Sequence, residues 1–108
     1  MALLLAALAG CTGVVPADSG PACDSGINVT WNNFGEGFFT TYCQSCHSST
    51  TPDRRDAPKR ANFDTEAQVG SYVDEVRARV LEDETMPVGG GVDPDDLVLL
   101  DRYLDCAF

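Results

Sequence analysis

The stretch Cys43-Gln44-Ser45-Cys46-His47 places two thiols three positions apart and an imidazole directly after the second thiol. Thiols at this spacing can add across the two vinyl groups of a haem as thioethers, and a His at this position can ligate the iron as its proximal ligand. We therefore expect one covalent haem c, attached through Cys43 and Cys46, with its iron bound by His47.

Three other kinds of site can contain such a stretch. A zinc site would need further Cys or His ligands, but His47 is the only His, and the other cysteines stand singly at Cys11, Cys23 and Cys106. A thioredoxin-type pair would follow a strand in a βαβ unit, whereas an aromatic segment with helical spacing precedes Cys43. A structural disulfide gives no role to the adjacent His.

The composition limits the size of the chain and its partners. With 108 residues it permits one small domain, and its 44% hydrophobic residues distinguish it from a disordered tail. The 17 acidic and 7 basic side chains give a net charge of -10. Nucleic-acid binders need clustered Lys and Arg in excess, so this class is excluded.

The N-terminus predicts export and a lipid anchor. Residues 1–10 are uncharged and mostly Leu and Ala, but a membrane-spanning helix needs about 20 apolar residues. The run ends Leu8-Ala9-Gly10-Cys11, which resembles the bacterial lipoprotein box. We expect residues 1–10 to be a signal peptide, Cys11 to be acylated, 11–22 to be a flexible tether, and 23–108 to form the domain. An apolar start that is not processed is the alternative.

The segment before the motif predicts a helix over about residues 31–46. Thr30 is a suitable N-cap, and aromatic residues follow at helical spacing. Gly35 and Gly37 lower the helix propensity of this segment, so at least one of them is expected to serve another purpose.

Two further helices follow. The first covers about residues 65–83, where Thr65 and Gln68 form a capping box ahead of a stripe of valines. The last begins at Asp93-Pro94, with a capping Asp and a Pro in the first helical position. Because the chain contains no convincing strand alternation, we expect an all-α fold.

Residues 23–108 resemble the class I cytochromes c. The closest resemblance is to small, exported, lipoprotein-like c-type cytochromes with a Trp-x-x-Phe-Gly helix before the haem motif, here Trp31, Phe34 and Gly35. The resemblance implies a cytochrome c-like fold, with three main helices around one covalently bound haem. It also implies an electron carrier rather than an enzyme.

The family also implies a crossing between the first and last helices. There the first helix presents a Gly and an aromatic residue four positions apart, which Gly35 and Phe39 match. The last helix presents an aliphatic and an aromatic residue three apart, which Leu100 and Tyr103 match. The resemblance therefore gives Gly35 a role in packing.

A sixth iron ligand is expected from the loop before the last helix, where the family supplies a Met. Met86, followed by Pro87, is the only Met once the signal peptide is removed. Ligation by His47 and Met86 would raise the reduction potential relative to two His ligands. Ordinary packing of Met86 is the alternative, and Lys59 is the remaining strong donor.

The resemblance further implies that a proline carbonyl after the motif accepts the ring N–H of His47, which would fix the tautomer. Pro58 stands at the appropriate distance, and Pro52 is the alternative. Four cationic residues surround Pro58, and they either pair with haem propionates or lie on a solvated loop. These are Arg54, Arg55, Lys59 and Arg60.

Cys23 and Cys106 remain after haem and lipid have taken the other three cysteines. Both flank the helical region, so we expect them to form a disulfide that contributes about 4 kcal/mol by restricting the unfolded chain.

These expectations combine into a periplasm-facing, monomeric monohaem lipoprotein in the bacterial cell envelope, which passes electrons between redox proteins. Because the chain is acidic, we expect partners with a basic docking patch. Thr12 after the acylated Cys favours the outer over the inner membrane. The alternatives are a haem-based ligand sensor or small peroxidase with a labile sixth ligand, and a haem-free lipoprotein with two disulfides, Cys43–Cys46 and Cys23–Cys106.

Overall fold

The computed structural model describes residue 23, residue 26 and residues 28–108. All regular elements among these residues are helical and none is a strand, which confirms the all-α prediction. The expected signal peptide, acylated Cys11 and tether lie outside the described residues. Within the described part of the chain, no helix combines the length and apolar character needed to cross a bilayer.

The first helix consists of η1 (Trp31–Gly35), which is wound as a π-helix, and α2 (Glu36–Tyr42), which continues it. Thr30 caps its start, as predicted, because its side chain accepts from the backbone N–H of Asn33 at 3.2 Å. The side chain of Asn33 in turn accepts from the N–H of Thr30 at 2.7 Å. These reciprocal bonds satisfy backbone donors that a helix start leaves free.

The prediction that this helix continues to Cys46 is wrong, because regular helix ends at Tyr42. The backbone N–H groups of Cys46 and His47 both donate to the carbonyl of Cys43, at 3.2 and 2.9 Å. The chain therefore folds into tight turns over residues 43–46, and the motif lies on a loop rather than on a helix face.

The segment predicted as one helix over residues 65–83 contains an interruption. It forms α3 (Glu66–Gly70), α4 (Val73–Val76) and η2 (Arg77–Glu82). The N–H groups of Ser71 and Tyr72 bond to carbonyls three residues earlier, at 3.2 and 2.9 Å. Such bonds wind the chain more tightly and interrupt the regular helical pattern, in which each N–H donates to the carbonyl four residues earlier.

The two predicted helix starts at Thr65 and Asp93 are confirmed. The Thr65 side chain accepts from the N–H of Gln68, and the Gln68 side chain accepts from the N–H of Thr65. The Asp93 side chain accepts from the N–H of Asp95 at 2.8 Å, at the start of α5 (Pro94–Ala107). Both caps depend only on neighbouring residues, which is why the sequence predicts them well.

The predicted crossing of the first and last helices is also confirmed. Phe39, Leu100 and Tyr103 are completely buried there, and the rings of Phe39 and Tyr103 have centroids 6.5 Å apart. A Cβ atom on Gly35 would lie 2.9 Å from Cζ of Tyr103 and 2.8 Å from Cε3 of Trp31. Only glycine fits this position without displacing a ring.

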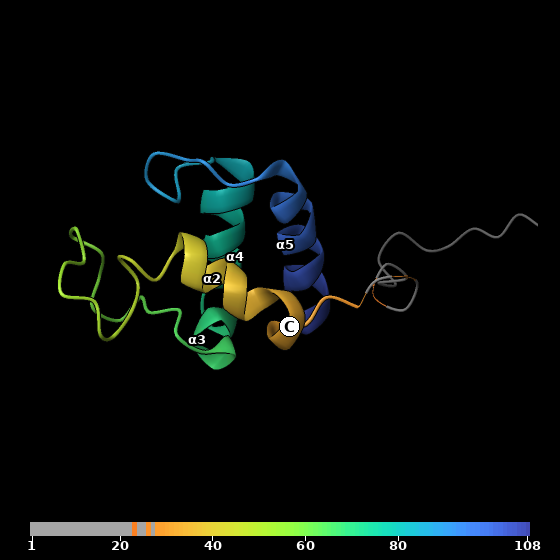
Figure 1. Cartoon of the computed structure of the whole chain (residues 1–108), viewed down its shortest axis with the longest axis horizontal. Helices are drawn as coiled ribbons and strands as arrows, with labels where there is room; N and C mark the ends of the chain where they lie inside the picture. The colour runs from red at the N-terminus through yellow and green to blue at the C-terminus, as the bar shows by residue number, and fades with distance from the viewer. Residues whose placement is uncertain (1–22, 24–25, 27) are drawn as a thin grey trace, which may run out of the picture.

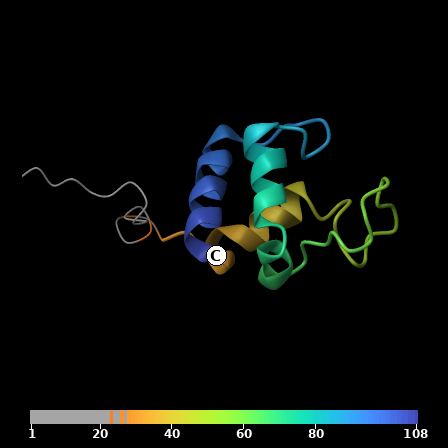
Figure 2. The same ribbon diagram turned by 180° about the vertical axis from the view of Figure 1, so that it is seen from behind.

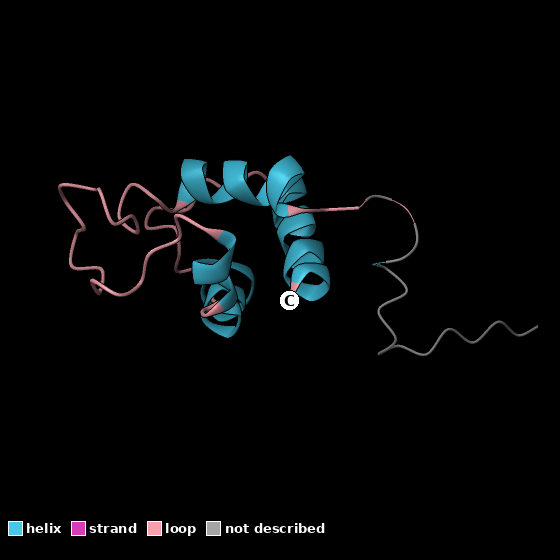
Figure 3. Ribbon diagram, turned by 90° about the horizontal axis from the view of Figure 1, so that it is seen from below, coloured by secondary structure: helices cyan, strands magenta, loops and turns pink. Residues whose placement is uncertain are grey.

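The α4–η2 segment lies beside α5, and α2 crosses near them (Figures 1 and 2). The loop that follows α2 extends away from the helices on one side, as the view from below makes plain (Figure 3). The molecule therefore has a region of packed helices and a region of loop, and the motif lies at the boundary between them.

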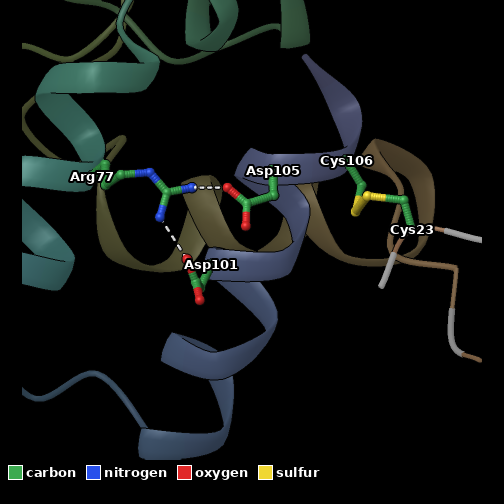
Figure 4. A network of polar contacts seen from close by, with 5 residues as sticks. All are labelled: Cys23, Arg77, Asp101, Asp105 and Cys106. Atoms are coloured by element: carbon green, nitrogen blue, oxygen red, sulfur yellow. Dashed lines mark hydrogen bonds and ion pairs between the residues drawn. A yellow bond between two sulfur atoms is a disulfide. The ribbon is translucent and has the colours of Figure 1, made fainter. Parts of the chain in front are cut away.

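Three contacts join other parts of the chain to α5 (Figure 4). Arg77 of η2 forms ion pairs with Asp101 and Asp105, at 2.5 and 2.6 Å. Near the end of α5, Cys106 is bonded to Cys23, with a Cα–Cα distance of 5.4 Å. The predicted disulfide is thus present in the structure.

Candidate functional site

A cavity of about 580 Å³ lies between the loop after α2, the α4–η2 segment and the loop before α5. Cys43, Cys46, His47 and Met86 all line this cavity, so the four predicted ligand and attachment residues lie together. Its apolar wall includes Ala61, Phe63, Tyr72, Val76 and Val80. Cavities of about 300–1,000 Å³ commonly enclose small organic ligands and cofactors.

The ring of His47 is oriented by the loop that follows it. Its Nδ1 atom lies 2.8 Å from the carbonyl oxygen of Ala61. A carbonyl oxygen only accepts hydrogen bonds, so Nδ1 carries a proton, and Nε2 is the ring nitrogen that this bond leaves unused. The ring also packs against Phe63, with centroids 5.0 Å apart. The contacts with Ala61 and Phe63 therefore orient the ring and leave Nε2 as the nitrogen available to bind a metal.

The prediction that the Pro58 carbonyl accepts from His47 is wrong, because Ala61 has that role. The Pro58 carbonyl accepts instead from Nη2 of Arg54 at 2.7 Å and from the N–H of Ala61 at 2.9 Å. The second bond closes a turn, which carries the chain past Pro58 and brings the Ala61 carbonyl to the ring. Pro58 still lines the cavity, and Pro52 does not.

Arg54 fits neither interpretation of the basic cluster, since it is not a solvated side chain and its donors are used within its own loop. The half-buried guanidinium donates to five acceptors between positions 48 and 62. These are the carbonyls of Ser48 (2.7 Å), Ala57 (3.4 Å), Pro58 (2.7 Å) and Ala61 (3.2 Å), and Oδ1 of Asn62 (2.7 Å). The hydrogen bonds of Arg54 therefore connect parts of the loop between residues 48 and 62.

Three exposed arginines also line the cavity. Arg55 and Arg60 come from the loop and Arg79 comes from η2, whereas Lys59 is not a lining residue. None of the three forms an ion pair with a residue that the structure describes. Arg79 cannot be identified as a cavity residue from the sequence, because its distance from the motif depends on how the α4–η2 segment packs.

Met86 lies in the loop between η2 and α5. Its N–H donates to the carbonyl of Arg79 at 3.1 Å, which folds this loop back over η2. The half-buried side chain packs against the hydrophobic core and lines the cavity. Met86 therefore offers a thioether at the cavity wall, and Lys59, the other donor considered, does not reach it.

Cys43 and Cys46 are free thiols in the structure. Burial raises the pKa of Cys43 to about 12, so this thiol stays protonated at neutral pH. A thioredoxin-type nucleophile needs a lowered pKa, and a chain held by disulfides alone would join the two sulfurs.

Among the described residues, His, Cys, Asp and Glu do not gather in groups of three or more that could hold a metal ion.

Tyr42 is a cavity residue that the sequence indicates only as part of an aromatic helix face. Its hydroxyl donates to Asp96 at 2.9 Å and accepts from the N–H of Asp93 at 3.5 Å. The hydrogen bond to Asp96 raises the pKa of Tyr42. These bonds tie the end of α2, directly before the motif, to the start of α5. Such a long-range polar contact has no signal in a single sequence.

Comparison with known proteins finds no relative: no family model, no curated protein and no solved structure matches this chain. The resemblance to the class I cytochromes c therefore rests on the motif, Met86 and the residues of the helix crossing. What the site can do follows from the chemistry of its own residues.

Proposed function

We propose that this chain is a monohaem c-type cytochrome, which carries single electrons between redox proteins in the bacterial cell envelope. The observation that carries the proposal is the common cavity: Cys43, Cys46 and His47 line it together with Met86, which comes from a separate loop. Cytochromes c use the same groups: two thiols that attach the porphyrin, and an imidazole and a thioether that bind the iron.

The cavity also suits a haem in its polarity. Phe63 and Val76 contribute an apolar wall of the kind that a porphyrin face needs. Arg55, Arg60 and Arg79, which form no ion pair with any described residue, offer guanidinium groups as counter-charges for the two propionate carboxylates. The donors, the apolar wall and the cations therefore support the same cofactor.

In the proposed holoprotein, Cys43 and Cys46 form the thioether links, and His47 and Met86 bind the iron. When bound, the haem supplies one-electron iron chemistry, which no side chain of the protein can provide. Ala61 keeps His47 in the tautomer that presents Nε2. The thioether of Met86 stabilises the ferrous state and so raises the reduction potential.

The surface charge bears on the redox partners. Asp93 and Asp95 are exposed at the start of α5, and the chain carries a net charge of -10. We propose that the monomer docks with a partner that presents a basic patch. Its association rate should then fall as salt concentration rises.

The proposed membrane attachment concerns residues outside the described part of the chain. We propose that residues 1–10 are removed, that Cys11 is acylated, and that residues 11–22 tether the domain to the periplasmic face of the outer membrane. Cys11→Ser should move the protein from the membrane fraction to the soluble periplasm, because an acyl chain contributes about 0.8 kcal/mol per buried CH₂. Continued membrane association of the variant would contradict the lipid anchor.

A visible spectrum of the purified protein tests the proposed cofactor. We expect the α-band of a c-type cytochrome, and we expect the haem to remain on the protein after acidified acetone extraction. The double variant Cys43→Ser and Cys46→Ser is the control and should lose covalent haem. A chain without an α-band would refute the proposal. Rapid binding of added carbon monoxide would favour the ligand sensor or peroxidase over the electron carrier.

A further inference from the structure

The carbonyl oxygen of Ala61 takes part in two hydrogen bonds, and the second one joins His47 to a cation. Nδ1 of His47 lies 2.8 Å from this oxygen, and Nη2 of Arg54 lies 3.2 Å from it. We propose that Arg54 is a positioning residue for His47, which fixes the carbonyl that orients the ring and raises the reduction potential of the haem iron. The inference rests on the haem ligation proposed above.

The placement of Arg54 supports this role beyond the shared oxygen. Nη1 donates to the carbonyl of Ser48 and to Oδ1 of Asn62, both at 2.7 Å. Ser48 directly follows His47, and Asn62 directly follows Ala61. One planar guanidinium therefore bonds to the neighbours of both partners in the His47–Ala61 hydrogen bond. A Lys could not hold this arrangement, because its ammonium lacks the rigid fork of donors.

The charge of Arg54 is held close to His47 without a carboxylate partner. Arg54 forms no ion pair within the described part of the chain. Asp64 feels its field, but the oxygens of Asp64 accept from Ser48 and Ser49 instead. The guanidinium of Arg54 therefore spends its hydrogen bonds on loop carbonyls and Asn62 rather than on a carboxylate.

The charge of this cation raises the potential. The ferric state carries one more positive charge than the ferrous state, so a nearby cation disfavours it. The cation therefore favours the ferrous state, and loss of Arg54 should lower the potential.

The test compares Arg54→Met with Lys59→Met in the haem-loaded protein. Both variants remove one positive charge from the same loop, but Lys59 neither lines the cavity nor bonds to the Ala61 carbonyl. We expect Arg54→Met to change the equilibrium constant of the one-electron couple by about tenfold, which lowers the potential by about 59 mV. Lys59→Met should shift it by less than half as much.

A second readout follows the His47 ring itself by NMR of the ferrous protein. The Nδ1 proton should change its chemical shift and exchange faster with solvent in Arg54→Met, and should not change in Lys59→Met. Arg54→Lys keeps the charge and loses the fork, so its Nδ1 proton should also exchange faster while the potential falls less. This variant carries the test if Arg54→Met does not fold.

The outcomes separate this inference from a structural role and from the proposed function. If the Arg54 variants melt at lower temperature but keep the potential and the Nδ1 signal, Arg54 only stabilises the loop and the inference is overturned. A raised potential overturns it as well. A wild-type protein without covalent haem defeats the proposed function first, and the visible spectrum reveals this before any variant is made.

Discussion

The helix crossing and the cavity loop, residues 43–63, are stabilised by different means. At the crossing, the side chains of Phe39, Leu100 and Tyr103 are completely buried. The rings of Phe39 and Tyr103 pack against each other. The cavity loop buries few side chains, namely Ser48, Ala61 and Phe63. Its shape depends on polar side chains that bond to backbone groups. Apolar packing therefore stabilises the helices, whereas individual hydrogen bonds position the residues of the site.

The hydrogen bonds of the cavity loop reach across it at several points besides Arg54. The amide of Gln44 donates to the carbonyl of Phe63 at 3.0 Å, and the hydroxyl of Thr51 donates to the carbonyl of Ser45 at 2.8 Å. Asp64 accepts from the hydroxyl of Ser48 at 2.6 Å and from the N–H of Ser49 at 2.9 Å. The loop can therefore be disturbed locally without unfolding the helices.

The largest expected effect is on the site, and Met86→Ala produces it. If Met86 is the sixth ligand, the variant should keep covalent haem but become high-spin, bind carbon monoxide and have a lowered potential. Far-UV circular dichroism should change little, because the side chain lies at the cavity and outside the helix crossing. A low-spin spectrum with an intact Met-to-iron charge-transfer band would refute the assignment.

The next largest effect concerns the scaffold and its disulfide. The double variant Cys23→Ser and Cys106→Ser should lower the free energy of unfolding by about 4 kcal/mol, because the bond closes a long loop in the unfolded chain. The two cysteines are 83 positions apart. The haem spectrum at room temperature should persist, since neither cysteine lines the cavity. Loss of haem at room temperature would contradict this expectation, because it would mean that the cavity needs the disulfide to keep its shape.

The same division explains which features the sequence predicts. The caps at Thr30, Thr65 and Asp93 depend on residues two or three positions away, so they can be predicted directly. Helix ends are less predictable, because the end at Tyr42 and the break at Ser71 depend on turns that the neighbouring packing selects.

The sequence predicts the thiol, imidazole and thioether residues of the cavity, and little else about it. Cys43, Cys46 and His47 stand in a recognisable motif, and Met86 stands out as the one Met beyond the start of the chain. Ala61 carries no signal, because its contribution to His47 is a backbone carbonyl that every residue possesses. The donor residues could therefore be named from the sequence, and the residue that orients His47 could not.

A smaller effect is expected at the helix crossing. Gly35→Ala places a Cβ against Tyr103 and Trp31, and we expect it to destabilise the protein by about 1–3 kcal/mol through overpacking. Gly37→Ala is the matched control on the same helix, because a Cβ there meets no atom within 4 Å. This control should stabilise by about 0.5–1 kcal/mol, since Ala favours helix more than Gly does. Chemical unfolding measures both, and equal effects would refute the packing role of Gly35.

The smallest effect tests the polar loop through pH. Asp64 accepts hydrogen bonds from the hydroxyl of Ser48 and from the backbone N–H of Ser49. These bonds, above all the one from Ser48, hold the pKa of Asp64 below its ordinary value. A carboxyl with a lowered folded pKa stabilises the protein above its unfolded pKa, about 3.9, and this contribution is lost as pH falls through the folded pKa. Ser48→Ala should therefore cost about 1 kcal/mol at pH 7 and less in acid, as measured by urea unfolding. Ser71→Ala, an exposed control outside the loop, should show no such pH dependence. An equal cost of Ser48→Ala at both pH values would mean that its hydroxyl acts independently of the Asp64 charge.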